Sequence, residues 1–435
     1  MNYNTKYMDA LFLEEFCALS RRKYEENHPV RVGIYDNATV LPFKPSDKNH
    51  SKGLGGVIDQ NGKYAEISAV YQEDLMPAGY AVPNEDSIQY YDEKAVYLGY
   101  FIHQWGHFLV DFLPRLWWLI EHYNDEKILV LVSGSAVRFD GNYLEMLSLF
   151  GIKEEKIHYV FEAERYRQIT VPELSMQRPD YYSEECRAVY NYIAGKLCKN
   201  IHLPHYQRIY WRRTKLKKAK MTEIGEKEIE KLFKRNGYKI LSPEKCSLKE
   251  QVYYFSTCKE MASLSGTIPH NIVFSDSNTH YTIINKTYRV NTIQLMLNHF
   301  SGAKVEYVDA GICMFPASPG SGPFWLEVKP NLLNYAADCG FRIPQKFQRN
   351  GAVLNYISGI AKARRMTKYM KMYCRLKNPD LDIGGEIVGK ARPEACFEKK
   401  HTYFFYRKKL GFMNSDTNFI SFITHFYHYF IKGVR

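Results

Sequence analysis

Between residues 206 and 315 the chain alternates between short apolar runs and amphipathic runs of about ten residues. The first strand-like run is QRIYWRR, and the run that follows, EIGEKEIEKLFKRNG, has the spacing of a helix. Four of its apolar residues fall on one helical face: Ile224, Ile229, Leu232 and Phe233. Strands that alternate with helices of this length are typical of βα units around a parallel sheet. The alternation therefore predicts an α/β domain over residues 206–316.

Two further segments flank this domain. A chain of 435 residues exceeds what one hydrophobic core usually supports. Residues 1–205 contain short strand-like runs, turns and helical runs, and we expect an N-terminal α/β domain there. The stretch ASPGSGPF indicates a linker or turn, so residues 317–435 are predicted to be a linker and a helical extension.

The net charge of +12 resides in this extension, because residues 346–435 hold 18 Lys and Arg against 6 Asp and Glu. Its last segment, NFISFITHFYHYFIKGVR, spaces apolar residues three and four apart, as one face of a helix does. A basic amphipathic helix suits an anionic membrane surface. Packing on the protein's own domains or on a second subunit explains the pattern equally well. The body of the chain is neutral and has no known nucleic-acid-binding motif, which argues against a nucleic-acid partner.

The first residues, MNYNTKYMDALFLEEFC, lack the basic, apolar and small-residue regions of a signal peptide. No run of about 18 uncharged apolar residues occurs, which argues against a spanning helix. Nine cysteines occur without CxxC pairs, so free thiols are expected, and neither a zinc site nor a disulfide framework is indicated. We therefore expect a cytoplasmic protein, peripheral to the inner face of the cell membrane if the extension binds lipid.

Residues 99–120 read GYFIHQWGHFLVDFLPRLWWLI, which is apolar on nearly all sides and predicts a buried helix. Polar residues interrupt it at every fourth position, which a helix arranges as one slowly rotating stripe: His103, His107, Asp111 and Arg115. Buried ionisable groups are usually paired or face a cleft. The stripe is therefore either an Asp111–Arg115 ion pair with backbone-bonded histidines, or the lining of an active site with a general base.

Metal binding is the weaker interpretation of this segment. Two histidines four residues apart occur in the H-E-x-x-H motif, but Gln104 stands in the place of the glutamate and no third ligand is evident. Asp380 and Asp382 form a D-x-D pattern in the basic extension, far from the predicted nucleotide-binding unit. We therefore expect no metal and no cofactor.

Two later segments have the composition of an anion site. YWRRTKLKKAK places Arg212 and Arg213 just after a predicted strand, where open α/β sheets bind ligands, and guanidinium groups suit phosphate. ASLSGTIPHN ends a strand, turns at Ser265-Gly266-Thr267 and begins a helix, whose unpaired amides suit an anion. Solvated surface charge and an ordinary β-to-α turn are the alternatives.

The pattern H-x-W-G-H-F-L-x-D-x-L-P-R-L, His103 to Leu116, resembles the hallmark segment of glycosyltransferase family 61. Later features follow in that family's order. These are the arginine-bearing strand end, a helix with an acidic start at Glu226, the segment GYKILSPEKCSLKEQVYYF, and the small-residue turn that ends in Asn271. The resemblance spans about residues 95–310.

The resemblance implies an inverting glycosyltransferase with two Rossmann-like domains of the GT-B type. It implies a nucleotide-sugar donor, usually no metal, a glycan or lipid-linked oligosaccharide acceptor, and a role in capsule or exopolysaccharide assembly. On the acceptor side it places the predicted catalytic residues Asp111, His107 and His103, with Trp105 and Arg115 beside them. For the donor diphosphate it implies Arg212, Arg213, Lys217, Lys220, Ser265, Gly266, Thr267, His270 and Asn271.

This chain departs from the family at two places. The family often has His-Gly-Ala where Ser265-Gly266-Thr267 stand, and His270 is the nearest imidazole that substitutes. Lys217 or Lys220 replaces a second arginine, and lysine meets phosphate charge without a bidentate fork. The mechanism expected is deprotonation of the acceptor hydroxyl by Asp111, assisted or replaced by His107. A non-catalytic scaffold, or less readily a nucleic-acid-binding protein, is the alternative function.

Overall fold

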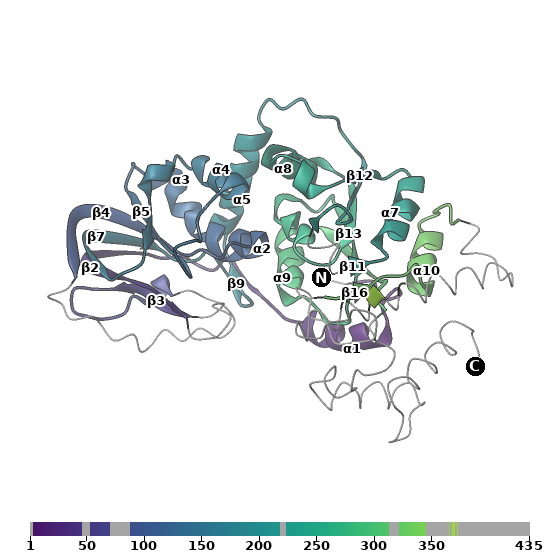
Figure 1. The fold of residues 1–435 in the computed structure, drawn as a ribbon, viewed down its shortest axis with the longest axis horizontal. Helices are drawn as coiled ribbons and strands as arrows, with labels where there is room; N and C mark the ends of the chain where they lie inside the picture. The colour runs from purple at the N-terminus through teal and green to yellow at the C-terminus, as the bar shows by residue number, and fades with distance from the viewer. Residues whose placement is uncertain are drawn as a thin grey trace, which may run out of the picture.

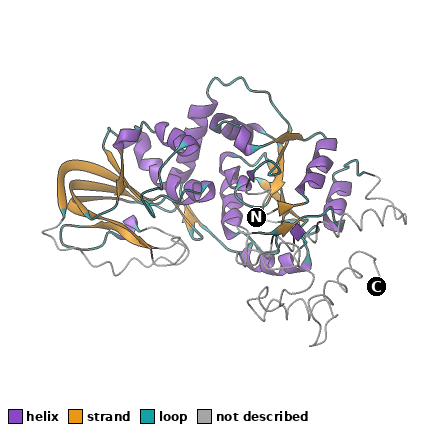
Figure 2. Cartoon of the chain, viewed as in Figure 1, coloured by secondary structure: helices purple, strands orange, loops and turns teal. Residues whose placement is uncertain are grey.

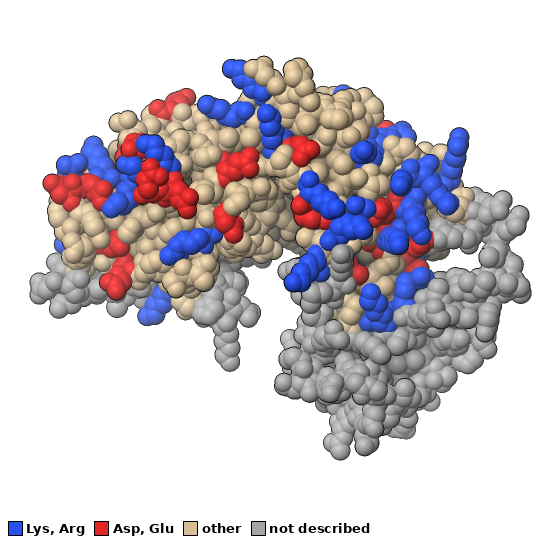
Figure 3. Space-filling model, turned by 45° about the horizontal axis from the view of Figure 1, so that its top comes forward, with Lys and Arg blue, Asp and Glu red and all other residues tan. Residues whose placement is uncertain are grey.

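The computed structural model describes residues 3–45, 53–69, 88–217, 223–312 and 322–344, with Arg365, Lys368, Tyr369 and Met372 of the extension. Several predicted features lie outside the described residues: most of the 317–324 linker, Lys220, the pair Asp380 and Asp382, and the C-terminal amphipathic helix. Two sheets and their helices form two lobes (Figures 1 and 2), which flank a hollow on the face seen in Figure 3.

The first lobe contains a mixed six-stranded sheet with the strand order β3-β2-β7-β4-β5-β6. β4 is parallel to both its neighbours, β7 and β5, and β6 is parallel to β5, whereas β2 pairs antiparallel with β3 and β7. The strands are β2 (Val32–Pro45), β3 (Gly53–Ile58), β4 (Gln89–Tyr100), β5 (Lys127–Leu131), β6 (Ile157–Val160) and β7 (Glu164–Pro172). Its longer helices are α4 (Gly141–Ser148) and α5 (Glu184–Cys198).

The second lobe contains a five-stranded sheet, entirely parallel, with the strand order β12-β10-β13-β14-β15. The strands are β10 (Arg208–Trp211), β12 (Lys239–Leu241), β13 (Glu260–Leu264), β14 (His280–Asn285) and β15 (Lys304–Asp309). One face packs on α7 (Glu226–Arg235) and α10 (Pro330–Asp338). The other face packs on α8 (Leu248–Thr257), the 3-10 helix η7 (Ile268–Phe274) and α9 (Thr292–Ser301). The α/β prediction for this region is confirmed.

Local signals in the sequence set several of these boundaries. α8 begins with a capping box, in which Ser247 accepts from the backbone of Glu250 and the Glu250 carboxylate accepts from the backbone of Ser247. Ile224, predicted on the face of the following helix, instead lies in the two-residue strand β11 (Glu223–Ile224), paired with β16 (Phe324–Trp325). Gly225 separates the two with a φ of 103°, which favours glycine. The helix therefore begins only at Glu226.

The N-terminal segment packs on the second lobe before the chain crosses to the first. Phe12 and Phe16 of α1 (Ala10–Leu19) contact the ring of Tyr307 in β15. The backbone N–H of Asp9 donates to the carboxylate of Asp309 at the end of that strand. Between the lobes, β1 (Glu25–Glu26), β8 (Met176–Gln177) and β9 (Tyr181–Tyr182) form a small sheet.

The segment predicted as one helix over residues 99–120 has a mixed conformation. β4 continues to Tyr100, and helical structure starts only at Trp105. It passes through α2 (Trp105–His107), the π-helical turn η3 (Phe108–Phe112), the 3-10 segment η4 (Leu113–Trp118) and α3 (Leu119–His122). Pro114 has no N–H to donate to the preceding turn, which interrupts a regular α-helix. The expected single stripe of polar residues does not form.

Arg115 shows the consequence of this broken register. It is 1% exposed, and its guanidinium donates to three backbone carbonyls, those of Ile67, Ala69 and Pro172, at 2.6 to 2.8 Å. The side chain therefore ties η4 to β7 and to the segment after β3. The Asp111–Arg115 ion pair considered from the sequence does not form, and Arg115 has a structural position.

Candidate active site between the two lobes

Asp111 lies at the centre of a polar cluster that joins η3 to the turn between β8 and β9. Arg178, in that turn, donates from Nε and Nη2 to Asp111 Oδ1 and Oδ2 at 2.8 and 2.9 Å. The Nδ1 of His107 lies 2.7 Å from Asp111 Oδ2. The side chains of Asp111 and Arg178 are only 12% and 8% exposed. Both carboxylate oxygens are thus engaged by donors.

This arrangement fixes which nitrogen of His107 is available. A carboxylate only accepts hydrogen bonds, so Nδ1 of His107 is the donor, and in the neutral ring Nε2 carries the lone pair. The side chain of His107 is 27% exposed, more than twice the fraction of Asp111. The imidazole therefore has a nitrogen free to take a proton from a ligand, whereas the carboxylate orients the imidazole.

η7 of the second lobe packs directly against this segment. A Cβ added to Gly106 would lie 2.9 Å from His270 Cδ2 and 3.3 Å from Thr267 Cγ2. Trp105 Nε1 donates to Asn271 Oδ1 at 3.0 Å. Only a glycine therefore fits at position 106 without displacing the second lobe, and the W-G-H sequence is the point where the lobes meet.

A buried hydrogen-bond chain sets the tautomer of His270. Gln294 Nε2 donates to the Pro269 carbonyl and to Asn298 Oδ1, at 3.1 and 2.8 Å, so Gln294 Oε1 must accept from His270 Nδ1 at 2.8 Å. The lone pair of the ring therefore lies on Nε2. Burial lowers the pKa of His270 to about 4, although the hydrogen bond that its ring donates to Gln294 acts in the opposite direction, and the charge of Arg178 adds to the lowering. His270 is neutral at physiological pH.

Acid is expected to destabilise the protein through His270. The imidazole pKa is about 6.5 when unfolded and about 4 when folded, so as the pH falls the unfolded state binds the proton first. Above the unfolded pKa, His270 costs the folded state no stability. As the pH falls from there towards 4, the free energy of unfolding declines by roughly 3 kcal/mol. Urea unfolding of wild type and His270→Gln at pH 7 to 4 measures this, with His103→Gln as the control. Equal pH slopes in wild type and His270→Gln would contradict it.

His103 lies apart from the other motif residues. Its Nε2 is 3.0 Å from Asp140 Oδ1, and both side chains are largely exposed. Because the chain is not helical before Trp105, His103 does not extend the face that carries His107 and Asp111. The structure therefore brings together two of the three predicted catalytic residues.

A second group of charges lies at the carboxyl edge of the second sheet. Lys286, directly after β14, is buried and donates to Glu223 Oε1 at 2.8 Å, and Arg213 Nε donates to both oxygens of Glu223 at 3.0 Å. Burial acts to raise the pKa of Glu223, but the two cations outweigh it and hold the pKa below its ordinary value. Glu226, which accepts from the backbone N–H of Arg213 at 2.8 Å, is a second carboxyl group in the cluster, and burial raises its pKa to about 8. Near neutral pH the two cations therefore outnumber the ionised carboxylates.

The turn Ser265-Gly266-Thr267 lies between this cluster and the His107 segment. Gly266 has a φ of 137°, and a Cβ there would lie 3.5 Å from Lys286 Nζ. The backbone N–H of Lys286 donates to Ser265 Oγ at 3.4 Å. On the other side, Thr267 faces Gly106, as described above. The predicted turn thus has cations on one flank and the segment that carries His107 on the other.

One comparison with known proteins gives a match for part of the chain. Residues 105–282 match the family model of glycosyltransferase 61. The match supports the family that the His103–Leu116 pattern resembles, and the family implies glycosyltransferase activity. No curated protein matches the chain.

Three other residues predicted for the donor site, Arg212, Lys217 and Asn271, do not join the Arg213–Lys286 cluster. Arg212 donates to Ser242 and Glu230 beside α7, and Lys217 is exposed. Asn271 bonds Trp105 and the Ile268 carbonyl, so its side chain is used in packing between the lobes. Of the predicted donor set, Arg213 and the turn at 265–267 therefore lie together.

Three site residues were not found from the sequence: Arg178, Lys286 and Gln294. Lys286 follows the strand-like run YTIIN, so the criterion that selected the arginines after β10 also selects it. No comparable signal marks Arg178, which is 67 residues from Asp111. Within the described ranges of the chain there is no group of three or more His, Cys, Asp or Glu able to hold a metal, and six cysteines carry free thiols. A search of the same described residues gives no helix long and apolar enough to cross a membrane.

Proposed function

We propose that the protein is an inverting glycosyltransferase that moves a sugar from a nucleotide-sugar donor to an acceptor hydroxyl. Transferase activity is what the family match implies. The position of the Gly266 turn, between the Arg213–Lys286 cations and the segment that carries His107, is the observation that supports the finer assignment. A donor diphosphate on one flank of this turn places its sugar towards the base on the other.

The reaction uses the two flanks separately. Inversion requires attack from the face of the sugar opposite the leaving group, so the base and the diphosphate site must lie on different sides of the sugar. His107 Nε2 takes the proton of the acceptor hydroxyl, the oxygen bonds to the anomeric carbon, and the bond to the diphosphate breaks. Asp111 stabilises the imidazolium that forms, and Arg213, Lys286 and the turn amides offset the charge of the leaving diphosphate.

Asp111 takes a positioning role in this proposal, although the sequence pattern favoured it as the base. Its two oxygens are engaged by Arg178 and His107, so no oxygen is left without a donor to receive the acceptor proton. A carboxylate that fixes the imidazole tautomer and stabilises its charged form performs the same task in hydrolytic triads.

The remaining family expectations belong to the same proposal. They are a GT-B type arrangement of two Rossmann-like domains, a glycan or lipid-linked oligosaccharide acceptor, capsule or exopolysaccharide assembly, and a peripheral position on the inner membrane face. Two lobes that meet at the W-G-H sequence support the first of these.

A panel of nucleotide-sugars, tested with the full chain for release of nucleoside diphosphate, examines the donor assignment. We expect Lys286→Gln to lower kcat/KM for the accepted donor roughly 10- to 100-fold, because one charge-assisted contact to phosphate is lost. Lys217→Gln, at an exposed position of the predicted donor set, is the matched control and should stay near wild type. If no donor in the panel is cleaved or transferred, the proposal fails and the non-catalytic scaffold is favoured.

A further inference from the structure

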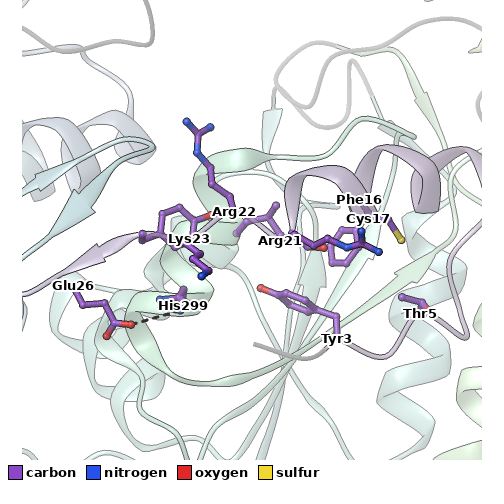
Figure 4. A pocket seen from close by; sticks show the side chains of 12 residues that line it. Tyr3, Thr5, Phe16, Cys17, Arg21, Arg22, Lys23, Glu26 and His299 are labelled. Carbon is purple, nitrogen blue, oxygen red and sulfur yellow. Dashed lines mark ion pairs between the residues drawn. The ribbon is translucent and has the colours of Figure 1, made fainter.

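A pocket of about 660 Å³ lies in the second lobe, and none of the active-site residues described above lines it (Figure 4). Its walls are the N-terminal segment, the end of α1 with the loop that follows, and α9. The volume is in the range of pockets that bind molecules of drug size. Nothing in the proposed reaction so far uses it.

The loop after α1 gives the pocket an excess of positive charge. Arg21, Arg22 and Lys23 line it in succession. Arg22 lies 3.8 Å from Asp180, and Figure 4 shows its guanidinium extending away from the other labelled side chains. Arg21 and Lys23 form no ion pair within the described part of the chain. Against these charges the pocket presents one carboxylate, that of Glu26. An anionic ligand is the complementary one.

Aromatic rings supply the rest of a sugar-sized site. Tyr3 and Tyr24 line the pocket, and the Tyr24 ring lies 5.3 Å from the ring of His299 on α9. Figure 4 shows the Tyr3 hydroxyl and the Lys23 side chain on the side nearer to His299. Burial lowers the pKa of His299, which favours its neutral form. Ring faces with hydroxyl groups and cations at the edge suit the apolar face and polar rim of an acidic sugar.

The pocket shares structural elements with the active site. His299 lines it, and Gln294, which orients His270, precedes His299 by five residues on α9, about 7.5 Å along the axis. Asn298 Nδ2 donates to the Tyr3 hydroxyl at 3.4 Å, and Asn298 Oδ1 accepts from Gln294. The Nδ1 of His299 lies 2.9 Å from the hydroxyl of Tyr182, in the strand that follows the turn with Arg178. α9 and β9 therefore connect the pocket to Gln294, which orients His270, and to the turn that carries Arg178.

The donor diphosphate site lies elsewhere. Asp9, just before α1, is held at the carboxyl edge of the second sheet through Asp309. α1 then runs for 10 residues, about 15 Å, before it reaches the basic loop. The pocket and the carboxyl edge of the sheet are therefore at opposite ends of α1.

We propose that this pocket, the α1–α9 pocket, binds an anionic residue of the acceptor glycan, one that carries a carboxylate or a phosphate. Its role as an acceptor subsite rests on the proposed transferase function. The acidic group binds Arg21 and Lys23, the sugar ring packs on Tyr24, and the acceptor hydroxyl extends towards His107. The acceptor is thus an acidic rather than a neutral polysaccharide.

Equilibrium binding to the full chain tests the proposal, with three trisaccharide probes of equal length: trigalacturonate, a phosphorylated trisaccharide and a neutral galactose trisaccharide. We expect at least one acidic probe to bind more tightly than the neutral one, and Arg21→Gln/Lys23→Gln to weaken it at least tenfold. The two acidic probes distinguish carboxylate from phosphate. The matched control is Lys234→Gln/Arg235→Gln, which removes two adjacent exposed charges at the end of α7.

Equal affinity for acidic and neutral probes, equal losses in the two double variants, or no binding of either acidic probe would each overturn the pocket assignment. Donor hydrolysis without acceptor, measured on the same proteins, reports separately on the transferase function. If acidic sugars bind through Arg21 and Lys23 but no donor is cleaved, the binding site stands and its assignment to an acceptor fails.

Discussion

Replacement of His107 by glutamine is expected to lower acceptor-dependent transfer about 10²- to 10⁴-fold, which is the usual contribution of a general base. Glutamine preserves a hydrogen-bonding group of similar size beside Asp111 but offers no nitrogen lone pair to take the acceptor proton. The side chain is 27% exposed, so the fold should tolerate the change. Transfer rates at saturating donor measure the loss of activity, and circular dichroism of the purified variant tests whether the fold is preserved.

The matched control for this prediction is His103→Gln, which makes the same substitution in the same motif. Among the described residues, the partners of His103 are the exposed Asp140 and neighbouring aromatic rings. Its rate should stay within a few-fold of wild type. A His107→Gln enzyme that transfers at the wild-type rate would remove His107 from the mechanism. Equal losses in both variants would instead indicate that the motif acts through packing.

Replacement of Asp111 by asparagine is expected to destabilise the fold as well as the reaction, by about 3 to 5 kcal/mol. From the sequence alone, the same substitution is expected to abolish transfer without affecting folding. The structure changes that expectation, because Asp111 neutralises Arg178, whose side chain is 8% exposed. Asparagine leaves this guanidinium buried without a counter-charge. Urea unfolding of wild type and variant at neutral pH measures the loss.

A double-mutant cycle separates this pair from other effects. Arg178→Met removes the buried cation, so adding it to Asp111→Asn should restore part of the lost stability, and the two changes should not be additive. Asp140→Asn, on an exposed partner of His103, should change stability by less than about 0.5 kcal/mol. Additive losses in the cycle would show that Asp111 and Arg178 are not coupled.

Periodicity predicted the parts of the fold in which local sequence and tertiary packing agree. Ile229, Leu232 and Phe233 are buried on one face of α7, as their spacing indicates. The prediction of one regular helix over residues 99–120 was wrong about where the helix begins and about its regularity. A buried strand end and a buried helix both appear in a sequence as apolar runs. Pro114 was the visible sign of irregular winding. The prediction that Ile224 lies in the helix was wrong for a similar reason. Ile224 is a buried strand residue, and Gly225 separates that strand from the helix that begins at Glu226.

The candidate site was predicted where its residues are close in sequence. His107 and Asp111 are four positions apart, and the structure joins them. The partners that decide their roles come from distant segments. Arg178 assigns the carboxylate a positioning role, and it reaches Asp111 through a turn of the first lobe that shares no pattern with the motif. A single sequence without its fold does not indicate which cation meets which carboxylate.

The place of β4 in the first sheet has a consequence for dissection of this protein. β4 lies between β7 and β5, yet it precedes Trp105, where the recognisable family sequence begins. That sequence also stops at residue 282, before Gln294 and the last strand of the second sheet. A protein cut at those limits lacks β2, β3 and β4 of the first sheet, and the end of β14 and all of β15 of the second. We therefore expect that the region matched by the family model does not fold by itself.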